Sequence, residues 1–200
     1  DWTRVKIYLD SAYKRCRDAE TVALLRGALL DSLIIAVISW LMPRGGVFIH
    51  SASIIWDGKG VVFSAPSGTG KTTHTDLWCE RYGVRVLDGD VTACRIVDGK
   101  PLVYGLPWCG ESGKFLNECV PLGAVVFLEQ SENNSIAKLT VREAFMQLYA
   151  RCFLYVLDEE TADRVMETVT AVVTGTDCYL LKCRPDFEAV ELVKECLEKA

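Results

Sequence analysis

Apolar and polar residues fall into blocks along this chain, and the length and spacing of each block predict a strand or a helix. Short apolar runs bounded by glycine or Asp-Gly turns indicate strands, whereas longer amphipathic stretches indicate helices. The mixed order of these blocks predicts a single α/β domain in which helices flank a mixed sheet. The predicted helices span 10–42, 71–82, 140–152, 160–173 and the chain from 185 onward, and the predicted strands lie at 47–56, 60–64, 84–87, 92–104 (a hairpin), 121–129 and 179–181.

Two Asp-Gly turns predict β-hairpins. Asp57-Gly58 separates the first two strands, and Asp98–Pro101 divides the stretch from Thr92 to Tyr104. Apolar runs on both sides of an Asp-Gly turn are typical of antiparallel pairs. The first hairpin therefore places an antiparallel strand that carries His50 next to the strand at 60–64.

The most hydrophobic segment runs from Ser32 to Met42 and is followed by Pro43 and Gly45-Gly46. Its length is roughly half of the ~20 residues that a membrane-spanning helix needs. We therefore predict a buried helix and no membrane association. The N-terminus lacks the basic start and the cleavage site of a signal peptide, so a cytoplasmic location is expected.

Composition narrows the classes of function. The chain has 200 residues, enough for one domain with a sizeable core. A net charge of −5 argues against nonspecific nucleic-acid binding, so no nucleic-acid partner is expected. The nine cysteines form no CxxC pair and only two histidines are present, which argues against a zinc site and favours reduced thiols in the cytosol.

The segment that follows the strand at 60–64 has the pattern of a phosphate-binding loop, and a predicted helix follows it. In this context the backbone N–H groups of the loop and of the helix N-terminus converge on an anion. Lys71 would neutralise the terminal phosphates and the Thr72 hydroxyl would ligate Mg²⁺. We predict that ATP or GTP binds here with Mg²⁺, although Ala65 stands where the usual pattern has glycine. The segment reads Ala65-Pro66-Ser67-Gly68-Thr69-Gly70-Lys71-Thr72-Thr73.

Two aspartates, Asp88 and Asp90, follow the next predicted strand. In an extended strand their side chains would share one face, with Gly89 pointing the other way. We expect Asp90 to hold the metal opposite Thr72, and Asp88 is a candidate for the base that takes the acceptor proton. The alternative is an Asx-Gly turn with two solvated carboxylates.

Three further candidates come from residue types near the loop. His50 could reach the γ-phosphate region from the neighbouring strand, or it could be a satisfied core histidine. The glycine-rich segment from Gly105 to Lys114 predicts a second loop for phosphate or acceptor, with Gly110, Glu111 and Lys114 as its candidate residues, or an ordinary surface turn. His74, one turn into the predicted loop helix, is expected to be a packing or surface residue.

Together these motifs give the chain a family resemblance. The sequence resembles the HPr kinase/phosphorylase and ATP-type phosphoenolpyruvate carboxykinase superfamily, and it is most similar to the short HPr-kinase-like serine kinases. The resemblance covers roughly 50–139, and a weaker one covers 179–190. It rests on three segments, His50-Ser51-Ala52, the run from Ser67 to His74, and Gly105-Leu106-Pro107-Trp108-Cys109-Gly110.

The resemblance implies a fold, an activity and site roles. The implied fold is a P-loop-containing mixed β-sheet of the HPr kinase/PEP carboxykinase type, spanning 44–200 after a helical lead-in at 1–43. The implied roles are phosphate binding by Lys71, metal binding by Thr72 and Asp90, and an active-site histidine at His50. Family members have two adjacent aspartates, whereas Gly89 takes the place of the first one here.

The predicted function is therefore ATP-dependent, Mg²⁺-requiring phosphorylation of a serine hydroxyl on a peptide or protein. HPr itself is not the expected acceptor, because the arginine-glycine signature of true HPr kinases is absent. Two alternatives stay open: a non-catalytic nucleotide-binding regulatory module, and a small-molecule kinase or carboxykinase-like enzyme. A homo-oligomer is left open, and because the chain begins at Asp1 rather than methionine, we expect it to be part of a longer protein.

Overall fold

The computed structural model describes residues 18–155 and 158–199, and its strands form one eight-stranded mixed sheet. The helices and strands follow in the order α1 (Ala19–Leu41), η2 (Met42–Arg44), β1 (Gly46–Trp56), β2 (Lys59–Ser64), α2 (Lys71–Tyr82), β3 (Arg85–Asp88), β4 (Val91–Val97), β5 (Lys100–Tyr104), η3 (Gly110–Ser112), β6 (Cys119–Gln130), β7 (Ser135–Lys138), α3 (Val141–Tyr149), α4 (Glu159–Gly175), β8 (Asp177–Cys183) and α5 (Phe187–Glu198). The predicted mixed α/β fold with flanking helices is confirmed.

The strand order is β2-β1-β4-β5-β6-β8-β7, with β3 paired to β1 and β2 paired a second time to β6. This second pairing closes β1, β4, β5, β6 and β2 into a ring, from which β8 and β7 extend. The pairs β2–β6 and β6–β8 are parallel, and the other pairs are antiparallel. Because β2 and β6 are parallel, their carboxyl ends lie at the same edge of the sheet, where the chain leaves β2 toward α2.

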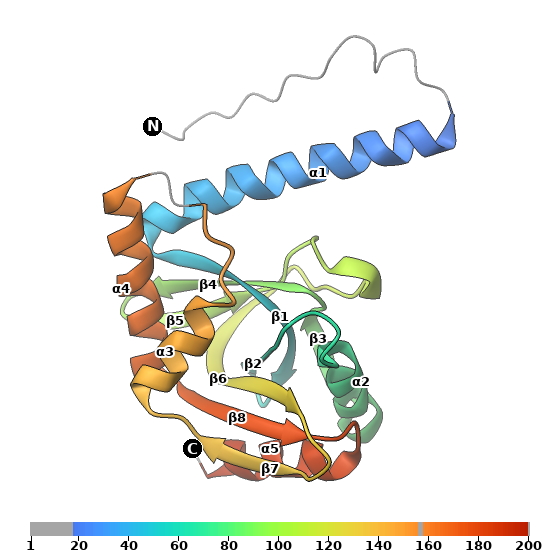
Figure 1. Ribbon diagram of the computed structural model, residues 1–200, viewed down its shortest axis with the longest axis vertical. Helices are drawn as coiled ribbons and strands as arrows, with labels where there is room; N and C mark the ends of the chain where they lie inside the picture. The colour runs from blue at the N-terminus through green and yellow to red at the C-terminus, as the bar shows by residue number, and fades with distance from the viewer. Residues whose placement is uncertain (1–17, 156–157, 200) are drawn as a thin grey trace.

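Helices cover both faces of the sheet (Figure 1). Successive residues of β6 point to opposite faces. Val125 and Phe127 pack in a core with α3, α4 and the end of α1, whereas Val126 and Leu128 pack in a second core with α2 and α5. Among the described residues, Trp78 is the largest fully buried side chain, and it anchors α2 in the second core. The sheet therefore carries a hydrophobic layer on each face, and these layers fix the position of the helices around the loop.

Most predicted elements are confirmed. The loop strand, the loop helix at 71–82 and both hairpins lie where the sequence places them. α2 ends at Gly83, which has a φ of 64° and so needs glycine's freedom to adopt the left-handed conformation. The sequence pattern did not predict β7, a short edge strand whose residues are mostly exposed and therefore carry little hydrophobic pattern. The part of the first predicted helix before residue 18 lies outside the described residues.

The prediction of a buried N-terminal helix is wrong. Only the C-terminal end of α1 packs on the domain, through Ile38 and Leu41, while Leu33, Ile35 and Val37 are 36–39% exposed. The rest of α1 projects away from the sheet (Figure 1). Within the described residues, one helix is long and apolar enough to cross a membrane; its window, Gly27–Arg44, has a mean hydropathy of 1.4 and is 22% buried. The division of the chain at 43/44 stays a prediction.

Candidate active site around the phosphate-binding loop

The loop between β2 and α2 has the backbone conformation of an anion site. Gly68 and Gly70 have φ values of 76° and 108°, a left-handed region that side chains with a Cβ rarely occupy. Gly70 is the N-cap of α2, and no side chain caps the helix there. The first N–H groups of α2 are therefore free to bind an anion, and the helix dipole favours a negative charge at this end.

Lys71 lies at the centre of the site and is 8% exposed. Its Nζ donates to the carbonyl oxygens of Ala65 at 3.1 Å and Pro66 at 3.4 Å, and lies 3.1 Å from Nε2 of His50. Burial lowers the pKa of Lys71, and the nearby Asp90 opposes this change. In this structure the ammonium group is held by its own loop, in a position from which it can turn toward a bound phosphate.

His50 lies in the middle of β1, where it pairs with Val91 of β4, one residue before the pairing of β1 with β2 begins at Ser51. Burial and the charge of Lys71 lower the pKa of His50, so its imidazole is neutral at pH 7. Lys71 can only donate, so Nε2 of His50 accepts and the ring proton lies on Nδ1. Asp90 Oδ1 lies 3.5 Å from the same nitrogen, a contact that becomes an ion pair only if His50 is protonated.

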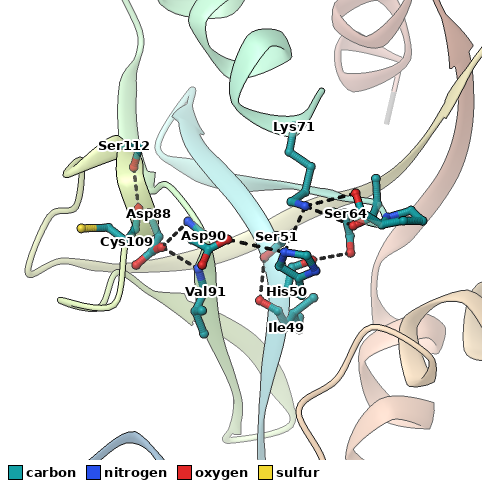
Figure 2. Close-up of polar contacts among 12 residues, drawn as sticks. Ile49, His50, Ser51, Ser64, Lys71, Asp88, Asp90, Val91, Cys109 and Ser112 are labelled. Atoms are coloured by element: carbon teal, nitrogen blue, oxygen red, sulfur yellow. Dashed lines mark hydrogen bonds and ion pairs between the residues drawn. The ribbon is translucent and has the colours of Figure 1, made fainter. Parts of the chain in front are cut away.

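Asp90 faces Lys71 and His50, and the three side chains converge in Figure 2. Its backbone is fixed on both sides. Its N–H donates to Oδ1 of Asp88 at 2.9 Å, and its carbonyl accepts from the N–H of Ser51 at 2.9 Å. The carboxylate of Asp90 is about two-fifths exposed and is therefore available to a ligand in the cavity.

Asp88 does not share a face with Asp90, because β3 ends at Asp88 and the chain turns at Gly89. The Asp88 side chain is fully buried and accepts three backbone hydrogen bonds, from Asp90, Val91 and Leu106, at 2.7–2.9 Å. Burial raises its pKa to about 6, and these amide hydrogen bonds partly offset the change. The structure thus contains the Asx turn that the sequence left open, but with Asp88 buried and its carboxylate occupied by backbone amides, and the base role stays a prediction.

The segment with Gly110 and Glu111 forms the short helix η3 beside Asp90. Gly110 and Glu111 line the same cavity as Lys71, whereas Lys114 is directed elsewhere. Nζ of Lys114 forms an ion pair with Asp76 on α2 at 2.7 Å, and this contact ties the η3 segment to the loop helix. In this structure Lys114 therefore ties the η3 segment to α2, and its contact with a phosphate stays a prediction.

Two cavities of about 670 Å³ each lie on either side of the loop and share Gly68, Gly70 and Thr73. The first cavity contains the ionisable side chains of the site. It is lined by His50, Ser67, Gly68, Gly70, Lys71, Thr72, Thr73, Gly89, Asp90, Gly110, Glu111 and Ser112. The second lies against the ends of β6 and β8 and is lined by Gly68, Thr69, Gly70, Thr73, His74, Leu128, Gln130, Ser131, Glu132, Cys183, Arg184 and Pro185. Of the loop residues named from the sequence as nucleotide-binding, only Pro66 lies outside both cavities.

The first cavity has donors suited to Mg²⁺. Thr72 supplies a hydroxyl and Asp90 a carboxylate, and both line its wall. Mg²⁺ usually takes one or two carboxylates and completes its shell with waters and phosphate oxygens, so a site of this kind needs few protein ligands. Among the residues that the structure describes, no three His, Cys, Asp or Glu side chains gather in a way that could hold a metal. The residues present fit a metal that arrives with its nucleotide.

Arg151 is a site residue that the sequence pattern did not indicate. The segment after α3 runs along β1, and the carbonyl of Arg151 accepts the N–H of His50 at 2.9 Å. The positive charge of Arg151 is among the causes that lower the pKa values of both His50 and Lys71. Nothing in its local sequence marks it, because only the pairing of two segments about a hundred residues apart brings it to the loop.

His74 is a packing residue. It is 3% exposed, its ring meets Phe63 edge-on, and its Nε2 accepts from the indole N–H of Trp78 at 3.3 Å. It contacts the second hydrophobic core, where it helps to orient the loop helix.

Comparisons with known proteins give a family but no activity. No curated protein matches this chain. Among solved structures, the HPr(Ser) kinase/phosphatase from Coxiella burnetii is similar at a TM-score of 0.44 and 10% identity, over 76% of this chain and 97% of that one. The family model of the SynChlorMet cassette protein ScmC matches residues 17–168, more than half of the sequence. The chain therefore belongs to the ScmC family of SynChlorMet cassette proteins.

Proposed function

We propose that this protein is an ATP-dependent, Mg²⁺-requiring phosphotransferase that phosphorylates a serine hydroxyl of a peptide or protein. The observation that carries the proposal is the convergence of Lys71, His50 and Asp90 at the mouth of an uncapped loop helix. Free amides and an ammonium group bind phosphates, and a carboxylate beside them suits a metal that accompanies those phosphates.

The two cavities support separate binding sites for the acceptor and for the nucleoside. The cavity with Asp90 and Glu111 would hold the acceptor, because the groups that can act on a transferring phosphoryl group lie there. The cavity against Leu128 and Pro185 would hold the nucleoside, since it shares the loop glycines but lacks Lys71 and Asp90. A nucleotide lying across the loop would then present its terminal phosphate to the acceptor side.

The proposed reaction is an in-line transfer. The acceptor oxygen forms a bond to the γ-phosphorus while the bond to the β–γ bridging oxygen breaks, and ADP leaves with that electron pair. The loop amides and Lys71 stabilise charge on the phosphoryl oxygens, and neutral His50 positions Lys71 through the contact at 3.1 Å. The hydroxyl proton is released to solvent late in the transfer, because Asp88 is occupied by backbone amides. Thr72 and Asp90 would hold Mg²⁺, which supplies charge neutralisation at the phosphates.

A second candidate function is a nucleotide-binding module without catalysis. It is favoured by one observation, the burial of Asp88 where a base was expected. Transfer of labelled phosphate from ATP to a serine peptide separates the two functions, because a module binds ATP without producing phosphoserine. Carbon dioxide release from oxaloacetate tests a carboxykinase-like activity in the same preparation.

The direct test of the proposed site compares two lysine variants. Lys71→Ala removes the cation inside the cavity, whereas Lys114→Ala removes a cation paired with Asp76 outside it. We expect Lys71→Ala to lower Mg-ATP affinity by about tenfold or more in calorimetry and to abolish transfer, since a hydrogen bond to a charged group contributes about 1.5–3 kcal/mol. Lys114→Ala should keep the affinity. Equal affinity of the wild type and Lys71→Ala would refute the assignment of the loop.

A cytoplasmic location is part of this proposal. The eight cysteines in the described part of the chain are all free thiols, and several lie in the core. Free thiols are usual in a reducing compartment, where ATP is also available.

A further inference from the structure

Arg151 holds its position through backbone pairing with the strand that carries His50. Its carbonyl accepts from His50, and two residues later the N–H of Phe153 donates to the carbonyl of Phe48 at 2.9 Å. Ile49 and Cys152 form an isolated antiparallel bridge between these two contacts. The backbone of Arg151 is thus fixed against β1. This backbone pairing places the Arg151 side chain beside the loop, independently of the contacts that the side chain makes.

The side chain of Arg151 has no partner of its own among the described residues. Its Nε is buried and makes no hydrogen bond, and its guanidinium forms no ion pair within the same part of the chain. A buried donor without an acceptor destabilises a protein unless a ligand satisfies it. Such a donor on a permanently charged group indicates that the missing partner is an anion.

The surroundings of Arg151 show which anion would fit. Arg151 lines a cavity of about 430 Å³ together with Ala65, Pro66 and Thr69 of the loop. The carbonyls of Ala65 and Pro66 are the same ones that hold Lys71. Arg151 and Lys71 therefore both lie beside Ala65 and Pro66 of the loop.

The local charge balance also points to an anion. Arg151 lies near enough to act electrostatically on both Lys71 and His50, and Asp90 is the carboxylate that lies beside His50. One other carboxylate, Glu129, lines the cavity of Arg151, and it is paired with Lys182 at 3.1 Å. Among the described residues, the cavity of Arg151 thus offers no carboxylate that is free to pair with its guanidinium.

We propose that Arg151 binds the terminal phosphate of the bound nucleotide, and this inference rests on the proposed function. A guanidinium presents its N–H groups as a planar fork that matches two oxygens of one phosphate, which a lysine cannot do. The γ-phosphate brings negative charge between Lys71 and Arg151, satisfies the unpartnered donor and relieves the repulsion between the two cations. ADP lacks this group, so Arg151 distinguishes ATP from ADP.

A structural role for Arg151 makes the opposite prediction for the free protein. If Arg151 stabilised the fold, its removal would lower the thermal midpoint. Because its buried donor is unsatisfied without ligand, we expect Arg151→Met to leave the thermal midpoint unchanged or to raise it.

The deciding experiment measures binding of Mg-ADP and of a Mg-bound, non-hydrolysable ATP analogue to four proteins. These are the wild type, Arg151→Met, Arg151→Lys and the control Arg142→Met, in which an exposed arginine in the first turn of α3 is replaced. We expect Arg151→Met to weaken analogue binding by about tenfold or more and ADP binding by less than about threefold, from the usual strength of charged hydrogen bonds. The affinity of Arg151→Lys for the analogue should fall between those of the wild type and Arg151→Met. Arg142→Met should bind both nucleotides as the wild type does.

The outcomes separate this inference from the function on which it depends. If the wild type binds both nucleotides and Arg151→Met weakens them equally or not at all, the γ-phosphate role is overturned while the nucleotide site stands. If Arg151→Met melts well below the wild type, the Arg151→Lys variant decides. An Arg151→Lys protein with a normal melting point and full affinity for the analogue would refute the forked contact. If the wild type binds neither nucleotide, the proposed function fails first and the role of Arg151 fails with it.

Discussion

Asp88 and Asp90 are two residues apart and have opposite environments. Asp88 is enclosed and accepts three backbone N–H groups, whereas Asp90 presents its carboxylate to Lys71 and His50. The first carboxylate organises the turn that positions the second. At the scale of single residues, the site therefore has one carboxylate enclosed by backbone amides and one open to the cavity.

This contrast predicts that Asp88→Asn mainly lowers the stability of the protein, whereas Asp90→Asn mainly abolishes phosphotransfer. Asp88→Asn replaces an acceptor oxygen by an NH₂ group that faces a backbone N–H, so we expect a loss of about 1–3 kcal/mol in the free energy of unfolding. Asp90→Asn removes an exposed charge and should change that free energy by less than about 0.5 kcal/mol, while phosphotransfer is lost. Urea unfolding and labelled-phosphate transfer measure the two effects. An Asp88→Asn protein with normal stability and a selective loss of turnover would restore Asp88 as the base.

At the scale of elements, the packing of η3 beside the end of β3 explains the glycine at position 89. The turn from Cys109 to Ser112 lies against Gly89. A Cβ at Gly89 would come within 1.9 Å of Ser112 Oγ, 2.9 Å of its Cβ and 3.1 Å of the Cys109 carbonyl. The glycine is thus required by a close approach between two elements.

Restoring a side chain at this position should therefore damage the site. We expect Gly89→Asp to displace η3, weaken nucleotide binding and lower the thermal midpoint, because overpacking typically costs about 1–3 kcal/mol. Gly89→Ala should show the same effects more weakly, and Ser112→Gly in that background should reverse them, since it removes the two closest atoms. Thermal melting and calorimetry of the single and double variants check this compensation. A Gly89→Asp protein with normal nucleotide binding and a normal melting point would contradict this requirement for glycine.

The helix α1 is the element whose environment the sequence described least well. Its apolar residues fit a buried helix, yet only its last turns contact the domain. Hydrophobicity along a helix reports a preference for leaving water, and it does not say what covers the surface.

At the scale of the whole molecule, the stability of the fold should depend on pH through the protonation of His74. Burial lowers the pKa of His74 to about 4, below the ordinary value near 6.5 that it regains on unfolding. The unfolded chain therefore binds more protons below pH 6.5. The contribution of neutral His74 is fully present above that pH and is lost as the pH falls toward 4.

This linkage predicts a measurable difference between two proteins. The stabilisation lost through His74 between pH 6.5 and 4 amounts to about 3 kcal/mol, as an order of magnitude. Asp88 acts in the opposite direction in this range because its pKa is raised to about 6. Subtracting the stability curve of His74→Gln from that of the wild type isolates the contribution of His74. Glutamine keeps an acceptor for Trp78 but does not titrate in this pH range. Parallel curves for wild type and variant would show that His74 is not buried in its neutral form.

Local patterns in the sequence predicted most of the elements. Alternating and helical periodicity located the hairpins and the loop helix, and the spacing of Gly68, Gly70, Lys71 and Thr72 marked the phosphate loop. These features depend on neighbours in the chain, so a single sequence contains them. The exposed edge strand β7 lacked such a pattern and was missed.

By itself, the sequence determined the α/β class, the glycine-rich loop that precedes α2 and the choice of Asp90 and His50 as residues near it. Only the tertiary structure decided the burial of Asp88, the contact that demands Gly89, the pairing of Lys114 with Asp76 and the arrival of Arg151 beside His50. The reason is physical. Each of these depends on which segments meet across the sheet, and that meeting is set by strand pairing and core packing between residues far apart in the chain.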